Sequence, residues 1–425
     1  MDKKQIPNNS FNTLIIGGGP AGSGLFMKSI KDGTLNQLLS GGLCLIEASD
    51  RLVSGQLDRY MVNSDTHSNV FLECLEGRAK DTFKLDRLKD GIDTFNEYAD
   101  KSIPLNKTGV LLDPLGLQLI ELIDQHPSSF VAINTEAEEV HENQDGGYRI
   151  ITKDHQIFQA KKIVIACGGR PRSSQLDLKY QNKAVHSDDV IKSKAEFSKL
   201  NPRDSIIIVG GSHSAFSAAH YLLENHEPLI SATQPIEIWA NEPPKIYFPS
   251  PEIAHAAKYE AFTEDDVCPL TNRVYRLAGL RMDGRELFMN MLGINDVVQE
   301  KRVVLKIINK SEGIPSAVLD EANLIIEATG YNFNMPKFYN QKKERMSFLG
   351  EKSFHWVNDD CQLVLANGEA LSKVFAIGLA SGFLPSGELG GEKSFHGQAN
   401  GIWYYQNLIA NIILKQLHEN TPIMP

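Results

Sequence analysis

The hydrophobic pattern of the chain contains one unit twice: a short apolar run, a turn of small residues, and a helical pattern. The first copy runs from Asn12 to Ile30, "NTLIIGGGPAGSGLFMKSI", and the second from Ser205 to Glu224, "SIIIVGGSHSAFSAAHYLLE". Short apolar runs that end in glycine are typical of buried parallel strands, and each turn here leads into a helix. The pattern therefore predicts two βαβ units, and these units are its only internal repeat.

The rest of the hydrophobic pattern predicts further short strands and two more helices. We expect a strand that ends at Glu47, a helix over 113–127, and several alternating strands with a hairpin at "QDGG" over 129–169. After the second unit, "PIEIWAN", "NLIIEATG" and "KVFAIGLASG" predict strands, and 397–417 predicts one terminal amphipathic helix. We expect a loose tail at 1–10 and a loop insertion at 34–42.

Composition limits the class of protein. A chain of 425 residues predicts two to three domains, and 42% hydrophobic with 23% charged residues is ordinary for a globular protein. The net charge of −10 without a basic cluster argues against nucleic acid as a partner. The N-terminal residues lack the apolar core of a signal peptide, and no apolar run approaches the ~20 residues of a membrane helix. We expect a cytoplasmic protein that is not bound to a membrane.

The cysteines point to a reducing compartment. Their number is odd and no two of them form a CxxC motif, which argues against a disulfide framework; they are Cys44, Cys74, Cys167, Cys268 and Cys361. No metal site is predicted.

The first turn has the spacing of a dinucleotide-binding fingerprint. Gly17 permits the tight turn, Gly19 lets the backbone approach a pyrophosphate, and Gly22 lets the helix pack closely on the strand. Pro20 and Ala21 complete the turn at the helix N-terminus, which offers free N–H groups to phosphate. The turn therefore predicts a bound dinucleotide.

An acidic residue follows the first unit where a ribose would lie. Glu47 ends the next strand, and its carboxylate could bind ribose hydroxyls, with Ala48 beside it. The gap from Gly22 exceeds the usual ~20 residues, and the insertion at 34–42 explains the excess.

The second turn, "GGSHSA", departs from the fingerprint at one position. Gly210 keeps the first role and Ala215 is a normal third residue, but Ser212 replaces the second glycine. A serine there reduces the room for phosphate and also supplies a hydroxyl donor. His213 and Ser214 complete the predicted binding turn. The alternative, a turn that keeps the fold without a ligand, stays open.

Two such turns in one chain resemble the two-dinucleotide-binding-domain flavoproteins. Residues 163–172, 323–336 and 374–382 are similar to the segments where these chains leave, re-enter and finish the FAD domain. The resemblance implies an α/β fold in which a Rossmann-like FAD domain, 1–170 and 335–425, is split by an inserted NAD(P) domain, 171–334. It also implies that Gly378 and Leu379 contact FAD, although relatives often carry Asp where this chain has Leu379.

Within that group the sequence resembles the N-hydroxylating and flavin-containing monooxygenases. "ATGYNFNMP" (328–336) matches one of their signatures, "GGSHSA" resembles their second turn, and Arg59 to Phe71 is similar to the segment that carries an Asn beside the flavin. A further motif, at Tyr180 to Val190, keeps only His186. The disulfide reductases of the group are excluded because the chain lacks their redox cysteine pair.

The resemblance implies oxygen insertion through a flavin C4a-hydroperoxide, with a small nucleophilic substrate such as an amine. It implies that Asn63 donates the hydrogen bond to the reacting oxygen, and that Gln56 and Gln398 face the isoalloxazine. It also implies that His186 orients the nicotinamide, whereas we expect Tyr331 and Trp239 to be packing residues. The expected substrate-lining segments are Leu52 to Tyr60, Asn241 to Glu252 and Gly382 to Gln398.

The nucleotide and the type of reaction stay open at this point. Lys245 is the only cation near the end of the second strand of the inserted domain, and the lack of an Arg there favours NADH, whereas the family resemblance favours NADPH. Two other functions also fit: an NAD(P)H-dependent reductase without oxygen insertion, and a non-catalytic FAD-binding protein. The expected partners are a small-molecule substrate and oxygen, and a homo-oligomer stays open.

Overall fold

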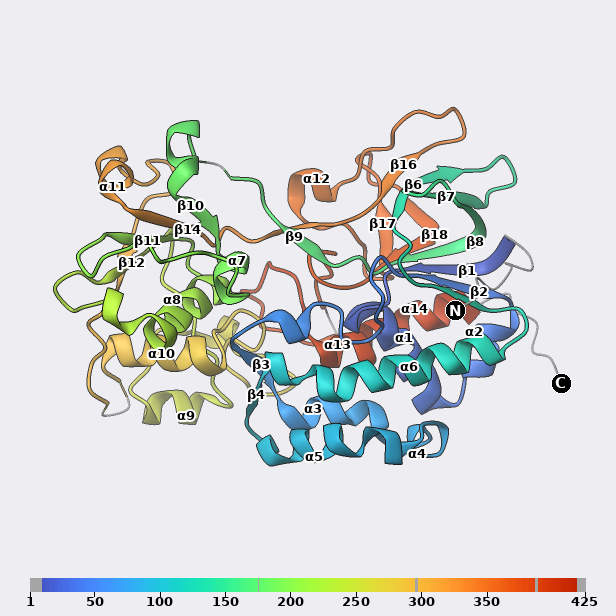
Figure 1. The fold of residues 1–425 in the computed structure, drawn as a ribbon, viewed down its shortest axis with the longest axis horizontal. Helices are drawn as coiled ribbons and strands as arrows, with labels where there is room; N and C mark the ends of the chain where they lie inside the picture. The colour runs from blue at the N-terminus through green and yellow to red at the C-terminus, as the bar shows by residue number, and fades with distance from the viewer. Residues whose placement is uncertain (1–9, 175, 295–296, 387–388, 419–425) are drawn as a thin grey trace.

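The chain folds into two α/β lobes that lie side by side in Figure 1. The computed structural model describes residues 10–174, 176–294, 297–386 and 389–418. Both lobes have the mixed α/β architecture expected of Rossmann-like domains, so the predicted fold class is confirmed.

The larger lobe is built on a sheet whose centre is parallel. Strand β1 lies between β2 and β8 and is parallel to both, and β18 extends the parallel part on the far side of β8. The apolar run Leu14–Ile16 is buried because the sheet is covered on both faces. In the described residues its strands are β1 (Ser10–Ile16), β2 (Leu43–Ile46), β5 (Phe130–Ala132), β6 (Ala137–Glu142), β7 (Tyr148–Thr152), β8 (Ile157–Ile165), β16 (Lys337–Tyr339), β17 (Gln362–Val364) and β18 (Ala370–Ala376).

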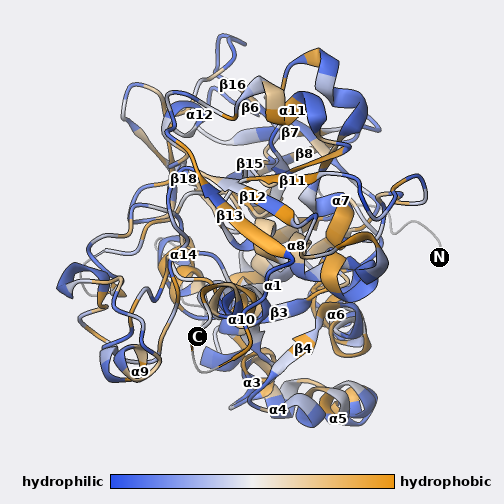
Figure 2. Cartoon of the chain, turned by 90° about the vertical axis from the view of Figure 1, so that its left-hand side faces the viewer, coloured by the Kyte–Doolittle hydropathy of each residue, from blue (hydrophilic) through white to orange (hydrophobic). Residues whose placement is uncertain are grey.

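The smaller lobe carries a parallel sheet of order β10-β14-β11-β12-β13 in the described chain. These strands are β10 (Ala184–His186), β11 (Ile206–Val209), β12 (Ile236–Ala240), β13 (Val303–Ile307) and β14 (Leu324–Glu327). Helices α7 (Ser187–Ile191), α8 (His213–Asn225) and α10 (Met282–Leu292) belong to this lobe. Figure 2 faces the lobe and shows β13 as a hydrophobic strand, and the lobe has a buried core of its own.

The chain passes between the lobes twice, and the two passing segments pair with each other. They form the antiparallel strands β9 (Gly169–Pro171) and β15 (Tyr331–Phe333). The domain boundaries after residues 170 and 334 lie at this pair and stay predictions. A second small ribbon, β3 (Asn63–His67) with β4 (Ser102–Pro104), lies where the lobes meet (Figure 1).

The helices of the larger lobe include two departures from the predicted pattern. The expected loop insertion at 34–42 is wrong, because a short helix, α2 (Leu35–Ser40), buries Leu38 and Leu39 there. The expected single terminal helix is broken at Asn407 into α13 (Ile402–Gln406) and α14 (Leu408–His418). The other helices of this lobe are α1 (Pro20–Asp32), α3 (Ser68–Leu72), α4 (Ala79–Thr82), α5 (Lys89–Tyr98), α6 (Gly109–Gln125) and α12 (Gly350–Ser353), whereas α9 (Pro251–Ala256) and α11 (Ser316–Glu321) belong to the smaller lobe.

Two expectations concern the chain ends and membranes. The predicted tail at 1–10 lies outside the described residues except for Ser10, which begins β1. Among the described helices, none combines the length and the apolar character that crossing a bilayer would require.

Candidate functional site

The first turn has the backbone geometry of a dinucleotide site. Gly17 has φ +104°, and a side chain on it would meet the carbonyl of Ala166. A Cβ on Gly22 would collide with the carbonyl oxygen of Gly17. At Gly19, the N-cap of α1, the closest approach would be an ordinary 3.6 Å to Gly55. Two glycines are therefore required for packing, and the third leaves room for a ligand.

Glu47 is oriented by the turn itself. Its Oε2 accepts a hydrogen bond from the Gly18 amide at 2.7 Å, and its Oε1 accepts from the amide and hydroxyl of Ser49 at 2.8 Å each. Each carboxylate oxygen has two lone pairs, so acceptor capacity remains for ribose hydroxyls. This is the arrangement that a dinucleotide ribose requires.

A cavity of about 1180 Å³ lies over this turn and extends between the lobes. Gly17, Gly19, Pro20, Ala21, Glu47 and Ala48 line it, whereas Gly22 lies behind it in the packed turn. Its volume, its small-residue floor and its oriented carboxylate fit FAD. The residues present could therefore hold that cofactor with its pyrophosphate at the N-terminus of α1.

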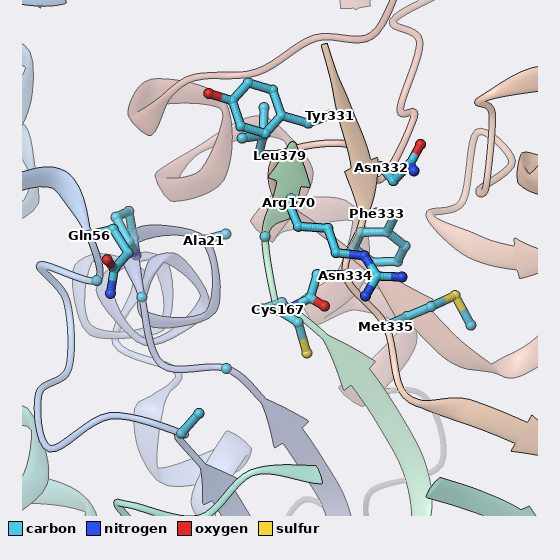
Figure 3. Close-up of a pocket in the computed structure, with 18 of the residues that line it drawn as sticks. Ala21, Gln56, Cys167, Arg170, Tyr331, Asn332, Phe333, Asn334, Met335 and Leu379 are labelled. Atoms are coloured by element: carbon cyan, nitrogen blue, oxygen red, sulfur yellow. The ribbon is translucent and has the colours of Figure 1, made fainter. Parts of the chain in front are cut away.

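Gln56 sits on a loop that an ion cluster braces. Arg51 contacts Asp58 at 2.7 Å and Asp113 at 3.1 Å, which ties the loop to α6. Gln56 lines the cavity, and Figure 3 shows it on the opposite side from Arg170. Its predicted position beside the flavin ring is compatible with this placement and stays a prediction.

Asn63 lines the cavity but is already bonded to the other lobe. Its Nδ2 donates to Asp283 Oδ1 at 3.1 Å, and its backbone amide donates to Asp283 Oδ2 at 3.3 Å. Asp283 is in the first turn of α10, so this contact joins β3 to the smaller lobe. One Nδ2 proton remains for the predicted hydrogen bond to oxygen. Phe71, from the same segment, is buried and also borders the cavity.

The end of β18 meets the start of α1. Gly378 has φ +111°, and a Cβ on it would lie 3.0 Å from the Cβ of Ala21. Leu379 lines the cavity and is visible in Figure 3 near Tyr331. An apolar side chain thus occupies the position where relatives often carry Asp, and contact with FAD there stays a prediction.

The second turn repeats the first in backbone shape. Gly210 has φ +126°, and a Cβ on it would meet the carbonyl of Ala328. Ser212 is the N-cap of α8 in extended backbone (φ −113°), so glycine is not needed there. His213 and Ser214, in the first turn of α8, line the same cavity as the first turn. Ser212 and Ala215 do not, and Ala215 is fully buried.

Lys245 is not among the cavity-lining residues. Its Nζ lies 5.4 Å from the centre of the Tyr275 ring. Its role in nucleotide binding and the choice between NADH and NADPH stay predictions.

A buried ion cluster that the sequence does not reveal joins the lobes beside the cavity. Asp188 accepts hydrogen bonds from Tyr60 at 2.8 Å and from Tyr331 at 3.1 Å, and its other oxygen accepts from Lys192 at 2.9 Å. Burial alone would raise the pKa of Asp188, but the hydrogen bonds and charge of Lys192, with the two tyrosines, lower it. The net effect is a depressed pKa. Ser214 is also hydrogen-bonded to Tyr331.

Tyr331 is therefore more than the packing residue that the sequence suggests. It connects the passing segment β15 to α7 and to the second turn. The signal that could have revealed this cluster is the spacing of Asp188 and Lys192, an i,i+4 pair on one face of a helix.

Several other sequence candidates lie away from the cavity. His186 is the N-cap residue of α7, but its side chain makes no capping bond. Trp239 donates to Glu237 at 2.9 Å, and Gln398 accepts from the Gly382 amide at 3.0 Å. Of the three expected lining segments, Leu52 to Tyr60 contributes to the cavity. The described residues of Asn241 to Glu252 and of Gly382 to Gln398 do not line it, which makes those two expectations wrong for this cavity.

The cysteines do not form a redox pair. All five are free thiols, four of them buried. Cys167 lines the cavity, but burial first, and then the charge of Glu47, raise its pKa to about 12. A thiol held in this protonated state is a poor nucleophile at neutral pH.

Two dinucleotide turns that share one cavity define an oxidoreductase that uses two nucleotide cofactors. The family model described as pyridine nucleotide-disulphide oxidoreductase matches residues 11–232, more than half of the chain. The chain belongs to this family, without the cysteine pair to which the family's name refers.

The chain is also similar to individual proteins over its whole length. It is 28% identical to CMP-5'-(3-aminopropyl)phosphonate hydroxylase from Streptomyces rubellomurinus, over 96% of this chain and 98% of that protein. Among solved structures it is similar to the cadaverine monooxygenase of desferrioxamine biosynthesis from Erwinia amylovora, solved with FAD (TM-score 0.60, 16% identity, 98% and 97% of the two chains). It is also similar to L-lysine 6-monooxygenase from Pseudomonas syringae (TM-score 0.59, 14% identity, 96% and 99%). The two structures support the fold.

Proposed function

We propose that the protein is an FAD-dependent, NAD(P)H-using monooxygenase that hydroxylates the amine of a small substrate. The observation that carries this proposal is the shared cavity: the first turns of α1 and α8 both face it, so a hydride can pass between two nucleotides bound there. The end-to-end similarity to a hydroxylase of an aminopropyl compound supports an amine as the group that is oxidised.

The proposed FAD site uses the first turn. Gly17, Gly19, Ala21 and the N-terminus of α1 would hold the pyrophosphate, and Glu47 with Ala48 would hold the adenosine ribose. Bound FAD supplies hydride acceptance and oxygen activation. Gln56 and Asn63 would border its reactive ring, where the remaining Asn63 Nδ2 proton is available to donate to oxygen.

The proposed nicotinamide site uses the second turn. His213 and Ser214 would contact the dinucleotide at the N-terminus of α8, and Ser212 would act through its backbone. We infer that this site belongs to an inserted domain, 171–334, within an FAD domain formed by 1–170 and 335–425. The ion cluster around Asp188 would hold the two domains together over the reacting groups.

A decisive experiment uses the FAD-loaded protein, NADPH or NADH, and isotopically labelled dioxygen. Four amines serve as substrates: CMP-5'-(3-aminopropyl)phosphonate, cadaverine, L-lysine and L-ornithine. The proposal predicts a product that carries one labelled oxygen, measured by mass spectrometry. Rapid nucleotide oxidation that yields only hydrogen peroxide with every amine would favour a reductase. If neither nucleotide reduces the flavin, both the monooxygenase and the reductase are rejected.

A further inference from the structure

Strand β3 contributes polar side chains to the junction of the lobes. Figure 2 shows it as a hydrophilic strand, and its residues Asn63 and Asp65 lie on the same face because side chains alternate along a strand. Asn63 contacts Asp283 of α10 from that face. Asp65 is therefore directed to the same junction.

Asp65 differs from the other carboxylates at this junction in having no hydrogen-bond donor. Asp188 accepts three side-chain hydrogen bonds, and Asp283 accepts two from Asn63. Within the part of the chain that the structure describes, no donor is found for Asp65. Its side chain is exposed and lines the cavity. A ligand that fills the cavity would displace water from this carboxylate, so a donor on the ligand is the expected complement.

The charges that face Asp65 come from three elements. Arg281, just before α10, and His213 on α8 favour its charged form, whereas Asp283 on α10 disfavours it. Burial is the largest influence and raises the pKa of Asp65. The site therefore holds a carboxylate that gains from a cationic ligand and accepts a proton more readily than an Asp with the ordinary pKa does.

We propose that Asp65 is the anchor for the substrate amine: its carboxylate pairs with the ammonium group in the cavity and takes up one of its protons. This inference rests on the proposed function, since it assumes that an amine is the group to be hydroxylated. The transfer balances as R–NH₃⁺ plus Asp65–COO⁻ giving R–NH₂ plus Asp65–COOH. The electron pair of the N–H bond stays on nitrogen as the lone pair.

The proton transfer answers a chemical need of the reaction. An alkyl ammonium group has a pKa of about 10 in water, so at neutral pH its nitrogen lacks the lone pair that attacks an electrophilic oxygen. An acceptor with a raised pKa narrows the difference in pKa between donor and acceptor. An ammonium ion also suits the carboxylate better than any neutral or anionic group, so Asp65 would select amines.

The test compares two ligands on the FAD-loaded protein without turnover. They are CMP-5'-(3-aminopropyl)phosphonate and the propyl analogue that lacks the amino group, titrated calorimetrically into wild type, Asp65→Asn and Asp65→Glu. The wild type should prefer the amine by at least about 30-fold, the range for a desolvated charge pair. Asp65→Asn should abolish the preference and leave the affinity for the propyl analogue unchanged. Asp65→Glu should restore part of it.

A matched control and a second readout separate the alternatives. Asp81→Asn removes an exposed carboxylate on α4, which does not line the cavity, and should keep the full preference. The rate of flavin reduction by NADPH should be unchanged in Asp65→Asn. A raised KM for NADPH, with the amine preference kept, would assign Asp65 to the nucleotide and overturn the proposal.

The binding results are independent of whether oxygen is inserted. Equal affinity of the wild type for the two ligands would overturn the role of Asp65, even if Asp65→Asn could not be folded. A wild type that prefers the amine through Asp65 but forms no hydroxylated product would leave the anchor in place and reject the monooxygenase.

Discussion

Replacing Asp188 with asparagine tests the ion cluster that joins the lobes. The change keeps an acceptor oxygen for Tyr60 and Tyr331 but removes the charge that faces Lys192 at 2.9 Å. The side chains of Lys192 and Asp188 are only 9% and 13% exposed, so solvent screens the pair weakly. Breaking a buried pair by removing one partner costs roughly 3–5 kcal/mol. The Tyr60 ring, 4.6 Å from Lys192 Nζ, offsets part of that.

We therefore expect Asp188→Asn to lose about 2–4 kcal/mol of unfolding free energy at pH 7. Urea unfolding of the FAD-loaded protein, followed by tryptophan fluorescence and flavin release, measures the change. Because Asp188 also accepts hydrogen bonds from Tyr60 of the larger lobe and from Tyr331 of the passing segment, the two signals should separate in the variant. Asp189→Asn, one residue further along α7, controls for general effects of charge at the helix N-terminus.

The pH dependence gives an independent check. The pKa of Asp188 is depressed in the folded protein, so its contribution is fully present above the unfolded value of about 3.9. That contribution is lost as the pH falls through the folded pKa. The stability gap between wild type and Asp188→Asn should be constant from neutral pH to about pH 5 and shrink only in acid. Equal stability of the two proteins at pH 7 would refute the reasoning.

Three further substitutions probe the nucleotide turns. Ser212→Gly should change the KM for NADPH or NADH by less than about threefold, since the serine backbone is extended and its side chain lies off the cavity; a tenfold change in steady-state assays would mean that the hydroxyl acts on the ligand. Glu47→Ala should weaken FAD binding about 10- to 150-fold in a fluorescence titration, the range for a charged hydrogen-bonding group, and unchanged affinity would remove Glu47 from the site. Gly22→Ala should yield protein without FAD, because its Cβ overlaps the Gly17 carbonyl; a normal absorbance ratio of flavin to protein would contradict the packing argument.

The sequence predicts the two βαβ units well because their signals are local. Each combines a buried strand, a turn that needs positive φ, and a helix, and the structure has all three at both places. The position of Glu47, directly after the second strand of the first unit, follows from the same local pattern. The sequence does not reveal β13 or α10 in this way: β13 has no glycine turn beside it, and α10 is marked only at its C-terminal end, by the left-handed Gly293.

The contacts between the lobes could not be predicted in the same way. The partners in the Asp188 cluster are separated by 128 and 143 residues, and only the fold brings them together. For the described residues of the segments Asn241 to Glu252 and Gly382 to Gln398, in contrast, the sequence predicts a contact with the cavity that the fold does not make. Their glycine and proline content suggested binding loops, but Glu392 instead accepts hydrogen bonds from the amides of Leu277 and Ala278. A high glycine and proline content indicates an irregular backbone, but it does not indicate which part of the molecule that backbone contacts.

The contact of Asn63 with Asp283 couples the chemistry of one lobe to the position of the other. Asn63 and Asp65 belong to the larger lobe, yet Asp283, Arg281 and His213, which set their surroundings, belong to the smaller one. A change in the angle between the lobes would therefore alter both the donor that faces oxygen and the carboxylate that faces the amine. His213 both faces Asp65 and lines the cavity at the first turn of α8, so the proposed nucleotide site and the proposed amine site adjoin at this junction.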